Sequence, residues 1–170
     1  MSHLAALKGI DSPRSKRDHY FTPPDLLALL HGELRFTLDV ASHPSAPSTE
    51  IIPRSYLFPG QDGLKLPWAG ERIWCNPPYS NISPWVSRAW EVASICPLIA
   101  MLLPANKTEQ PWWQQGVEPF RDRRSTPGQH FAVETRFLGR RIRFGDPEDP
   151  RGERASSGTF GSVLVIWRAL

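Results

Sequence analysis

The sequence is poor in cysteine and has no long apolar run. Only two cysteines occur, Cys75 and Cys96, with no CxxC pair and no histidine nearby at the spacing of metal ligands. This pattern excludes a disulfide framework and predicts two reduced, buried thiols and no metal site. No stretch approaches the roughly 20 apolar residues of a membrane span, and the N-terminal segment lacks the pattern of a signal peptide. We therefore expect a cytoplasmic protein without a membrane partner.

The size and composition are those of one ordinary globular domain. The chain has 170 residues, of which 40% are hydrophobic and 22% charged, so a substantial core is expected. Residues 1–19 are polar and basic without periodicity, and we interpret them as a flexible basic arm before a single domain over residues 20–170. The net charge of +3 is compatible with a nucleic-acid partner but does not establish one.

Short apolar runs predict a sheet of buried strands. The runs rich in strand-forming residues are 36–41, 72–75, 98–103, 131–137, 141–144 and 162–167. The polar segment from residue 42 to residue 64 is interpreted as a loop that contains the turn Asp62-Gly63.

Helix signals lie between several of these runs. Thr22 is expected to cap a helix that begins at Pro23 and ends at Gly32. Ser83 is expected to cap the next helix, and residues 108–117 predict a third. Because strands and helices alternate, we expect an α/β fold with a largely parallel sheet.

Polar side chains follow three of the predicted strands at the point where each strand ends. They are Asp39 with Ser42, Asn76 to Tyr79, and Asn106 with Lys107. Open parallel sheets bind their ligands outside the carboxyl ends of the strands. We therefore expect the three groups to converge on one crevice.

The most specific signal is Asn76-Pro77-Pro78-Tyr79, directly after the predicted strand at 72–75. The Asn76 side-chain oxygen and the Pro77 carbonyl can each accept a hydrogen bond from a planar amine, which helps it to attack an electrophile. The two prolines stiffen the loop and donate no N–H. Tyr79 offers a stacking face worth roughly 1–3 kcal/mol per base, against a few kcal/mol for flipping a base out of a duplex.

The motif alone does not decide which amine is methylated. Adenine N6 and cytosine N4 need the same geometry, and an RNA base or a protein amide offers a similar group. The arginine-rich C-terminal half favours a nucleic acid. An inactive DNA-binding relic is a further alternative, because the predicted strand at 36–41 leads into DVASHPS, which lacks the glycine-rich loop of many methyltransferases.

From about Tyr20 to Trp167 the chain resembles the small phage-type, Dam-like DNA N6-adenine methyltransferases. The segments that carry the resemblance are YFTPPDLLALL, FTLDVAS, QDGL, RIWCNPPYSNISPWV, IAMLLPANKT, RRIRFG and GSVLVIW. It implies a Rossmann-like methyltransferase fold, with a mostly parallel sheet, helices on both faces and an antiparallel C-terminal strand. It also implies S-adenosylmethionine as cofactor, a flipped-out DNA adenine as substrate, and a phage or prophage origin with action in the cytoplasm of a bacterial host.

The resemblance assigns roles to individual residues. The cofactor-binding positions that it implies are Tyr20, Thr22, Pro23, Asp39, Ser42 and Asp62. The first three match a motif near the methionine part of the cofactor, the next two match the end of the first strand, and the last is a candidate for the adenosine end. The catalytic loop that it implies consists of Asn76, Pro77, Pro78 and Tyr79. The oligomeric state and the DNA recognition sequence are left undetermined.

Arginines interleaved with phenylalanines occupy the C-terminal half. The candidates for DNA binding are Arg121, Arg123, Arg124, Arg140, Arg141 and Arg143. This pattern suits a surface that contacts phosphates, and the alternative is a solvated face whose arginines pair with Asp122, Glu134 and Asp146. Lys16 and Arg17 in the N-terminal arm are further candidates for phosphate contacts.

Overall fold

The computed structural model describes residues 18–123, 128–149 and 160–170. Nearly all of the arm expected at residues 1–19 lies outside the described residues, and so do the predicted DNA contacts Lys16, Arg17 and Arg124.

Six strands among the described residues form one sheet in the order β2-β1-β3-β4-β6-β5. The strands are β1 (Leu38–Ser42), β2 (Arg54–Leu57), β3 (Arg72–Cys75), β4 (Leu98–Pro104), β5 (Phe131–Phe137) and β6 (Ser162–Ala169). Strands β1 to β4 pair in parallel, whereas β6 runs antiparallel to both of its neighbours, β4 and β5. The expected α/β class and the antiparallel C-terminal strand are therefore confirmed.

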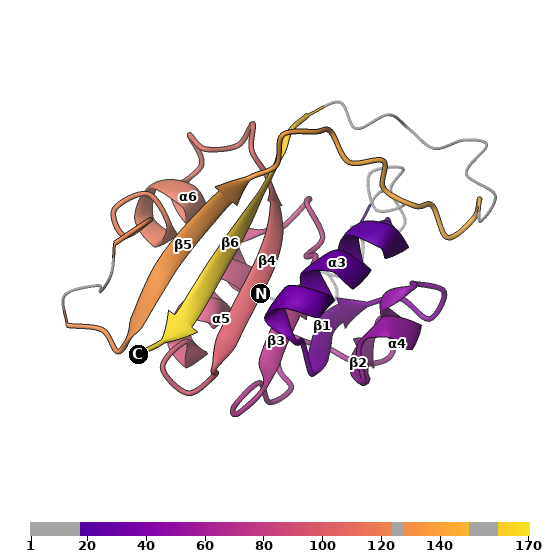
Figure 1. The fold of residues 1–170 in the computed structure, drawn as a ribbon, viewed down its shortest axis with the longest axis horizontal. Coiled ribbons are helices and arrows are strands. Elements are labelled where there is room, and N and C mark those ends of the chain that lie inside the picture. Colours follow the sequence, from indigo (N-terminus) through magenta and orange to yellow (C-terminus); the bar gives the residue numbers. More distant parts are fainter. Residues whose placement is uncertain (1–17, 124–127, 150–159) are drawn as a thin grey trace, which may run out of the picture.

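Helices cover both faces of the sheet (Figure 1). The helices are α3 (Pro24–Leu34), α4 (Ser48–Ile51), α5 (Ser83–Val92) and α6 (Pro111–Gly116). The buried leucines of α3, Leu27, Leu30 and Leu34, belong to one buried cluster, and the buried apolar residues of α5 and α6 belong to another on the opposite face. The sheet is thus the middle layer of three.

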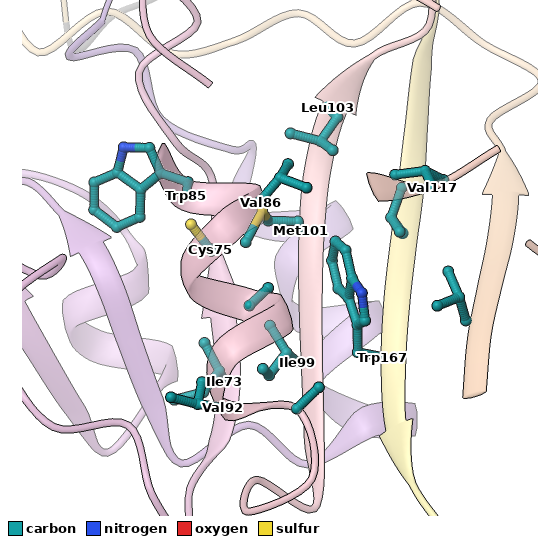
Figure 2. Close-up of a cluster of buried hydrophobic side chains, with 14 of the residues drawn as sticks. Ile73, Cys75, Trp85, Val86, Val92, Ile99, Met101, Leu103, Val117 and Trp167 are labelled. Carbon is teal, nitrogen blue, oxygen red and sulfur yellow. The ribbon is translucent and has the colours of Figure 1, made fainter. Parts of the chain in front are cut away.

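The central strand β4 explains why the sequence carries an unbroken apolar run there. All seven of its residues are buried, because side chains that alternate along a strand meet a different layer on each face. Ile99, Met101 and Leu103 face the α5 side, where Figure 2 shows them near Trp167 of β6 and Cys75 of β3. Both cysteines are free and buried, as expected.

The first helix begins and ends later than expected. Pro23 occupies the N-cap position of α3 without a side-chain capping bond, so the prediction that Thr22 caps this helix is wrong. The helix also continues past Gly32 to Leu34, and Arg35 ends it in a left-handed conformation, with its N–H bonded to the carbonyl of His31 at 2.8 Å. The exposed Gly32 meets no neighbouring atom and is accommodated within the last turn.

Three other local predictions are also corrected. Ser83 is the first residue of α5 rather than its cap, a position that Ile82 takes. The segment at residues 42–64 contains α4 and β2, because a single helical turn and a four-residue edge strand carry too little apolar periodicity to be recognised. Residues 141–144 pair with no strand among the described residues, although Ile142 and Phe144 are buried between exposed arginines.

Candidate functional site

A cavity of about 570 Å³ lies at the carboxyl ends of β1 and β3. This size falls in the range of small-molecule sites. Its walls come from the segment before α3, the end of β1, the loop after β2 and the loop after β3. The ends of β1 and β3 therefore converge as predicted. Asn106 and Lys107 lie outside the lining, because β3 separates the end of β4 from β1.

Most of the residues predicted for the site line this cavity. The lining includes Tyr20, Thr22, Asp39, Ser42, Asp62, Asn76 and Pro78. Pro23, Pro77 and Tyr79 lie outside it, the first at the start of α3 and the other two in the loop after β3. The sequence motifs around residues 20, 39, 62 and 76 are thus brought together, although they are far apart in the chain.

Asp39 is the buried acidic group of the cavity. It is 3% exposed, and its Oδ1 accepts a hydrogen bond from the backbone N–H of Ala41 at 3.0 Å. Burial raises the pKa of Asp39 to about 6, and bonds from Ser48, Ala41 and Ser42 lower it only in part. The Ser42 and Ser48 hydroxyls lie 2.9 Å apart beside it. A cationic ligand would favour the ionised form of this carboxyl group.

The charge of the lining narrows the class of ligand. Three aspartates line the cavity, Asp18, Asp39 and Asp62, and no lysine or arginine is found among the described residues that line it. Phosphate groups are bound by basic side chains or helix N-termini, so the lining disfavours a nucleotide polyphosphate. It suits a ligand that carries positive charge. The Thr22 hydroxyl is buried at this wall without a hydrogen-bond partner in the described structure, and it is available to such a ligand.

Gly63 brings the loop after β2 close to β1. A Cβ atom at this position would overlap the carbonyl oxygen of Val40, and the Gly63 carbonyl accepts a bond from the Trp68 indole at 2.7 Å. The sequence has no glycine directly after the first strand, and Asp62-Gly63 was interpreted as a turn in which Asp62, but not Gly63, was a candidate for the cofactor site. The close approach that requires glycine therefore occurs here, at the wall of the cavity and from a distant part of the chain.

The orientation of the Asn76 side chain is determined by a backbone contact. Its Nδ2 donates to the carbonyl of Tyr20 at 3.3 Å. The carbonyl can only accept, so the amide nitrogen faces Tyr20 and the oxygen is left for another donor. The neighbouring Pro78 carbonyl accepts from the Asn81 N–H at 3.1 Å. The Pro77 carbonyl has no hydrogen-bond partner in the described parts of the chain, as the interpretation of the motif requires.

Tyr79 is packed from several sides. Its hydroxyl donates to the Leu102 carbonyl at 3.0 Å. Its ring centre lies 6.0 Å from that of Phe144, at 84°, and 5.9 Å from that of Phe160, at 51°. Burial, and then the neighbouring Cys75, raise the pKa of Tyr79 far above its usual value. Tyr79 is therefore a neutral aromatic group rather than an acid or base near neutral pH.

The predicted DNA-binding arginines lie in two places. Arg121 pairs with Glu118 at 3.1 Å and Asp122 at 3.4 Å, beside the outer strand β5. Arg123 is exposed beside the same strand. Arg140, Arg141 and Arg143 are exposed and form no ion pair with any described residue. The last of these precedes Phe144, which contacts Tyr79.

The sequence analysis did not identify two histidines and a phenylalanine that line the cavity. The His19 ring stacks on Phe58 with centres 5.7 Å apart and an angle of 21°, and meets His43 edge-on at 5.6 Å. Phe58 lines the cavity and remains 43% exposed. These residues come from three separate loops, and no local motif could have linked them.

Neither a metal centre nor a membrane span is found in the described parts of the chain. They contain no group of three or more His, Cys, Asp or Glu side chains arranged to hold a metal ion. Their helices are all too short or too polar to cross a bilayer.

Comparison with known proteins agrees with these features. The model of the family described as DNA N-6-adenine-methyltransferase (Dam) matches residues 9–170. The DNA N-6-adenine-methyltransferase of Escherichia phage T1 is 31% identical over 103 residues, which are 59% of this chain and 42% of that protein. The chain thus matches less than half the length of this curated relative. No solved structure matches the chain significantly.

Proposed function

Because the chain belongs to the DNA N-6-adenine-methyltransferase (Dam) family, we propose that it methylates N6 of a flipped-out DNA adenine with S-adenosylmethionine. The observation that carries the proposal is that Asn76 and Asp39 line one cavity. A group that would hold an amine and a buried acid suited to a cationic methyl donor therefore share one cavity. The phage relative supports a phage- or prophage-encoded enzyme that acts in the bacterial cytoplasm.

We also propose that the sheet is that of a Rossmann-like methyltransferase. Support comes from the four parallel strands β2-β1-β3-β4 and from the insertion of the antiparallel β6 between β4 and β5. A cavity at the carboxyl ends of the parallel strands is the position at which open sheets of this class bind cofactors.

The residues of the cavity fit S-adenosylmethionine. When bound, this cofactor supplies a methyl group activated by its positively charged sulfur. Asp39 would lie near positive charge and remain ionised there, and the Thr22 hydroxyl would gain a partner. The partly exposed Phe58 ring suits the adenine ring, and Asp62, which is also exposed in the lining, suits hydroxyl groups of the ribose.

The catalytic loop would hold the target amine. The free oxygen of Asn76 and the carbonyl of Pro77 would each accept one N–H of the amine, which localises its lone pair for attack and stabilises the charge that develops. Tyr79 would offer its ring to the flipped base. Because its hydroxyl already donates to Leu102, Tyr79 would contribute packing rather than proton transfer.

We propose that Arg140, Arg141 and Arg143 contact the DNA backbone. All three are exposed, and Arg141 and Arg143 alternate with the buried Ile142 and Phe144, the second of which contacts Tyr79. Arg121, Arg123 and Arg124 remain predicted contacts. Arg121 would first have to leave its acidic partners.

The test of the proposed function is transfer of a labelled methyl group from S-adenosylmethionine. Purified protein is incubated in parallel with unmethylated DNA, RNA and a protein extract. We expect label in DNA only, and none with Asn76→Ala. Asn106→Ala is the matched control, because Asn106 is exposed after β4 and lies outside the cavity. Label in RNA or protein would favour the other amine substrates, and no transfer at all would favour an inactive relic.

A further inference from the structure

Residues Asp18–Thr22, which we call the strap, contact both sides of the cavity. All five line it. On the side of β1 and β2, the His19 ring packs against His43 and Phe58. The opposite side of the strap meets the loop after β3, so it bridges the binding region and the loop expected to perform the chemistry.

The strap is bonded to both ends of the catalytic loop. At one end, Tyr20 accepts the hydrogen bond from Asn76 at 3.3 Å. At the other, the Asp18 carboxylate accepts from the Ser80 N–H at 3.1 Å and from the Ser80 hydroxyl at 2.6 Å. Pro77, Pro78 and Tyr79 lie between these two attachments. The strap therefore spans the segment whose geometry decides where the amine sits.

A third attachment ties the strap to the arginine-bearing segment. The Phe21 N–H donates to the Gly145 carbonyl at 3.0 Å, and the Gly145 N–H donates to the Phe21 carbonyl at 2.9 Å. The Phe21 ring lies so close to Gly145 that a Cβ atom there would overlap it. With its centre anchored in this way, the strap has a defined position over the cavity.

We propose that Asp18 is a positioning residue that transmits cofactor binding to the catalytic loop through Ser80. This inference rests on the proposed function. A ligand that contacts Tyr20 and Thr22 restrains the strap, and the charge-assisted bonds of Asp18 extend that restraint to Ser80. Asn76 and Tyr79 are then held in place before the base arrives, which lowers the entropic cost of reaching the reactive geometry.

The first test is a double-mutant cycle of Asp18→Ala and Ser80→Ala. Turnover at saturating cofactor is measured, together with binding of S-adenosylhomocysteine by calorimetry. Asp18→Ala removes both bonds and should lower kcat by about ten-fold, whereas Ser80→Ala keeps the backbone N–H bond and should lower kcat less. The double variant should be no worse than Asp18→Ala, because the two residues share one contact. Additive losses, or kcat equal to wild type in Asp18→Ala, would overturn the proposal.

The chain offers a matched control for this cycle. Asp122 accepts from the Thr135 N–H at 2.9 Å and from the Thr135 hydroxyl at 2.8 Å, the same pair of bonds at the edge of β5. Thr135→Ala therefore removes an equivalent contact away from the cavity. It should leave kcat and cofactor affinity unchanged, which separates positioning from a general effect on the fold.

The second test needs no turnover. Hydrogen exchange of the Ser80 amide is followed with and without S-adenosylhomocysteine. The ligand should slow exchange in the wild type and not in Asp18→Ala. Equal slowing in both proteins, or none in a wild type that binds the ligand, would refute the role of Asp18 alone. A wild type that does not bind the ligand would instead refute the proposed function, and this inference with it.

Discussion

The side-chain nitrogen of Asn76 donates a hydrogen bond to the backbone carbonyl of Tyr20 at 3.3 Å. Because the partner is a backbone atom, the contact does not depend on the Tyr20 side chain. It leaves the Asn76 oxygen available to accept a bond from another donor, which is the role proposed for it toward the target amine. One bond thus connects the segment proposed to bind the cofactor with the proposed catalytic loop.

Substitution of Asn76 should separate chemistry from binding. We expect Asn76→Ala to lower kcat by about 100-fold or more, as is found when a single group that stabilises developing charge is removed. Asn76→Asp should retain intermediate activity, because it keeps an acceptor oxygen but sets another oxygen against the Tyr20 carbonyl. Single-turnover rates of the wild type and both variants would check this order of activities, and the affinity of each protein for S-adenosylhomocysteine would show whether binding has changed. An Asn76→Asp variant as active as wild type would contradict it.

Asp39→Asn should stabilise the free protein. The folded-state pKa of Asp39 is raised from 3.8 to about 6, so the folded protein favours the protonated form. Stability is therefore lost as the pH rises from about 4 to about 6, and above that the cost stays at about 3 kcal/mol. Urea unfolding at pH 4 and pH 7 should show this loss in wild type and a smaller one in Asp39→Asn. Identical pH dependence in both proteins would contradict the assignment.

The same variant should bind the cofactor less tightly. Asparagine keeps the acceptor for the Ala41 N–H but removes the negative charge that faces a cationic ligand. We expect affinity for S-adenosylmethionine at pH 7.5 to fall by about ten-fold, and wild-type affinity to fall as the pH drops below 6. Calorimetry at several pH values is the measurement. A more stable variant with undiminished affinity would show that Asp39 has no role in binding.

Gly63→Ala should damage both the fold and the cavity. The added methyl group would overlap the Val40 carbonyl, so β1 or the loop after β2 must move, at a cost of about 3 kcal/mol or more. Gly32→Ala is the control, because Gly32 is exposed in α3 with no atom near the added carbon. Its stability should rise by about 0.5–1 kcal/mol. Thermal unfolding of both variants distinguishes the overlap of an added methyl group with the Val40 carbonyl from the general effect of replacing glycine by alanine.

Replacement of the exposed arginines should change the salt dependence of DNA binding. Each lost phosphate contact reduces the slope of log affinity against log salt by about 0.9. Replacing Arg140, Arg141 and Arg143 together by glutamine should therefore reduce it by about 3. Arg121→Gln is the comparison, because its ion pairs with Glu118 and Asp122 compete with DNA. If Arg121→Gln had the larger effect, the DNA would lie along the β5 edge instead.

Features encoded in short segments were predictable from the sequence. The strand β4 was recognised because burial on both faces requires an unbroken apolar run. The loop from Asn76 to Tyr79 was recognised because its composition carries chemical meaning at a strand end. Asp39 and Asn76 line one cavity as expected, together with Asp62, whereas the expected participation of Asn106 and Lys107 was wrong.

Features created by contacts between distant segments could not be predicted. Asp18 and Ser80 are 62 positions apart, and neither residue type signals the contact alone. The requirement for glycine at position 63 arises from the carbonyl of Val40, a neighbour only in the folded chain. The N-cap position of Pro23 was missed because Thr22 matches a capping signal, whereas the buried Thr22 hydroxyl makes no capping bond.

The most direct test of the proposed activity is nucleoside analysis of DNA after methylation. Unmethylated DNA is incubated with S-adenosylmethionine and wild-type protein or Asn76→Ala, digested to nucleosides and examined by mass spectrometry. The account predicts N6-methyladenine with wild type and none with the variant. N4-methylcytosine as the product, or N6-methyladenine formed equally well by Asn76→Ala, would contradict it.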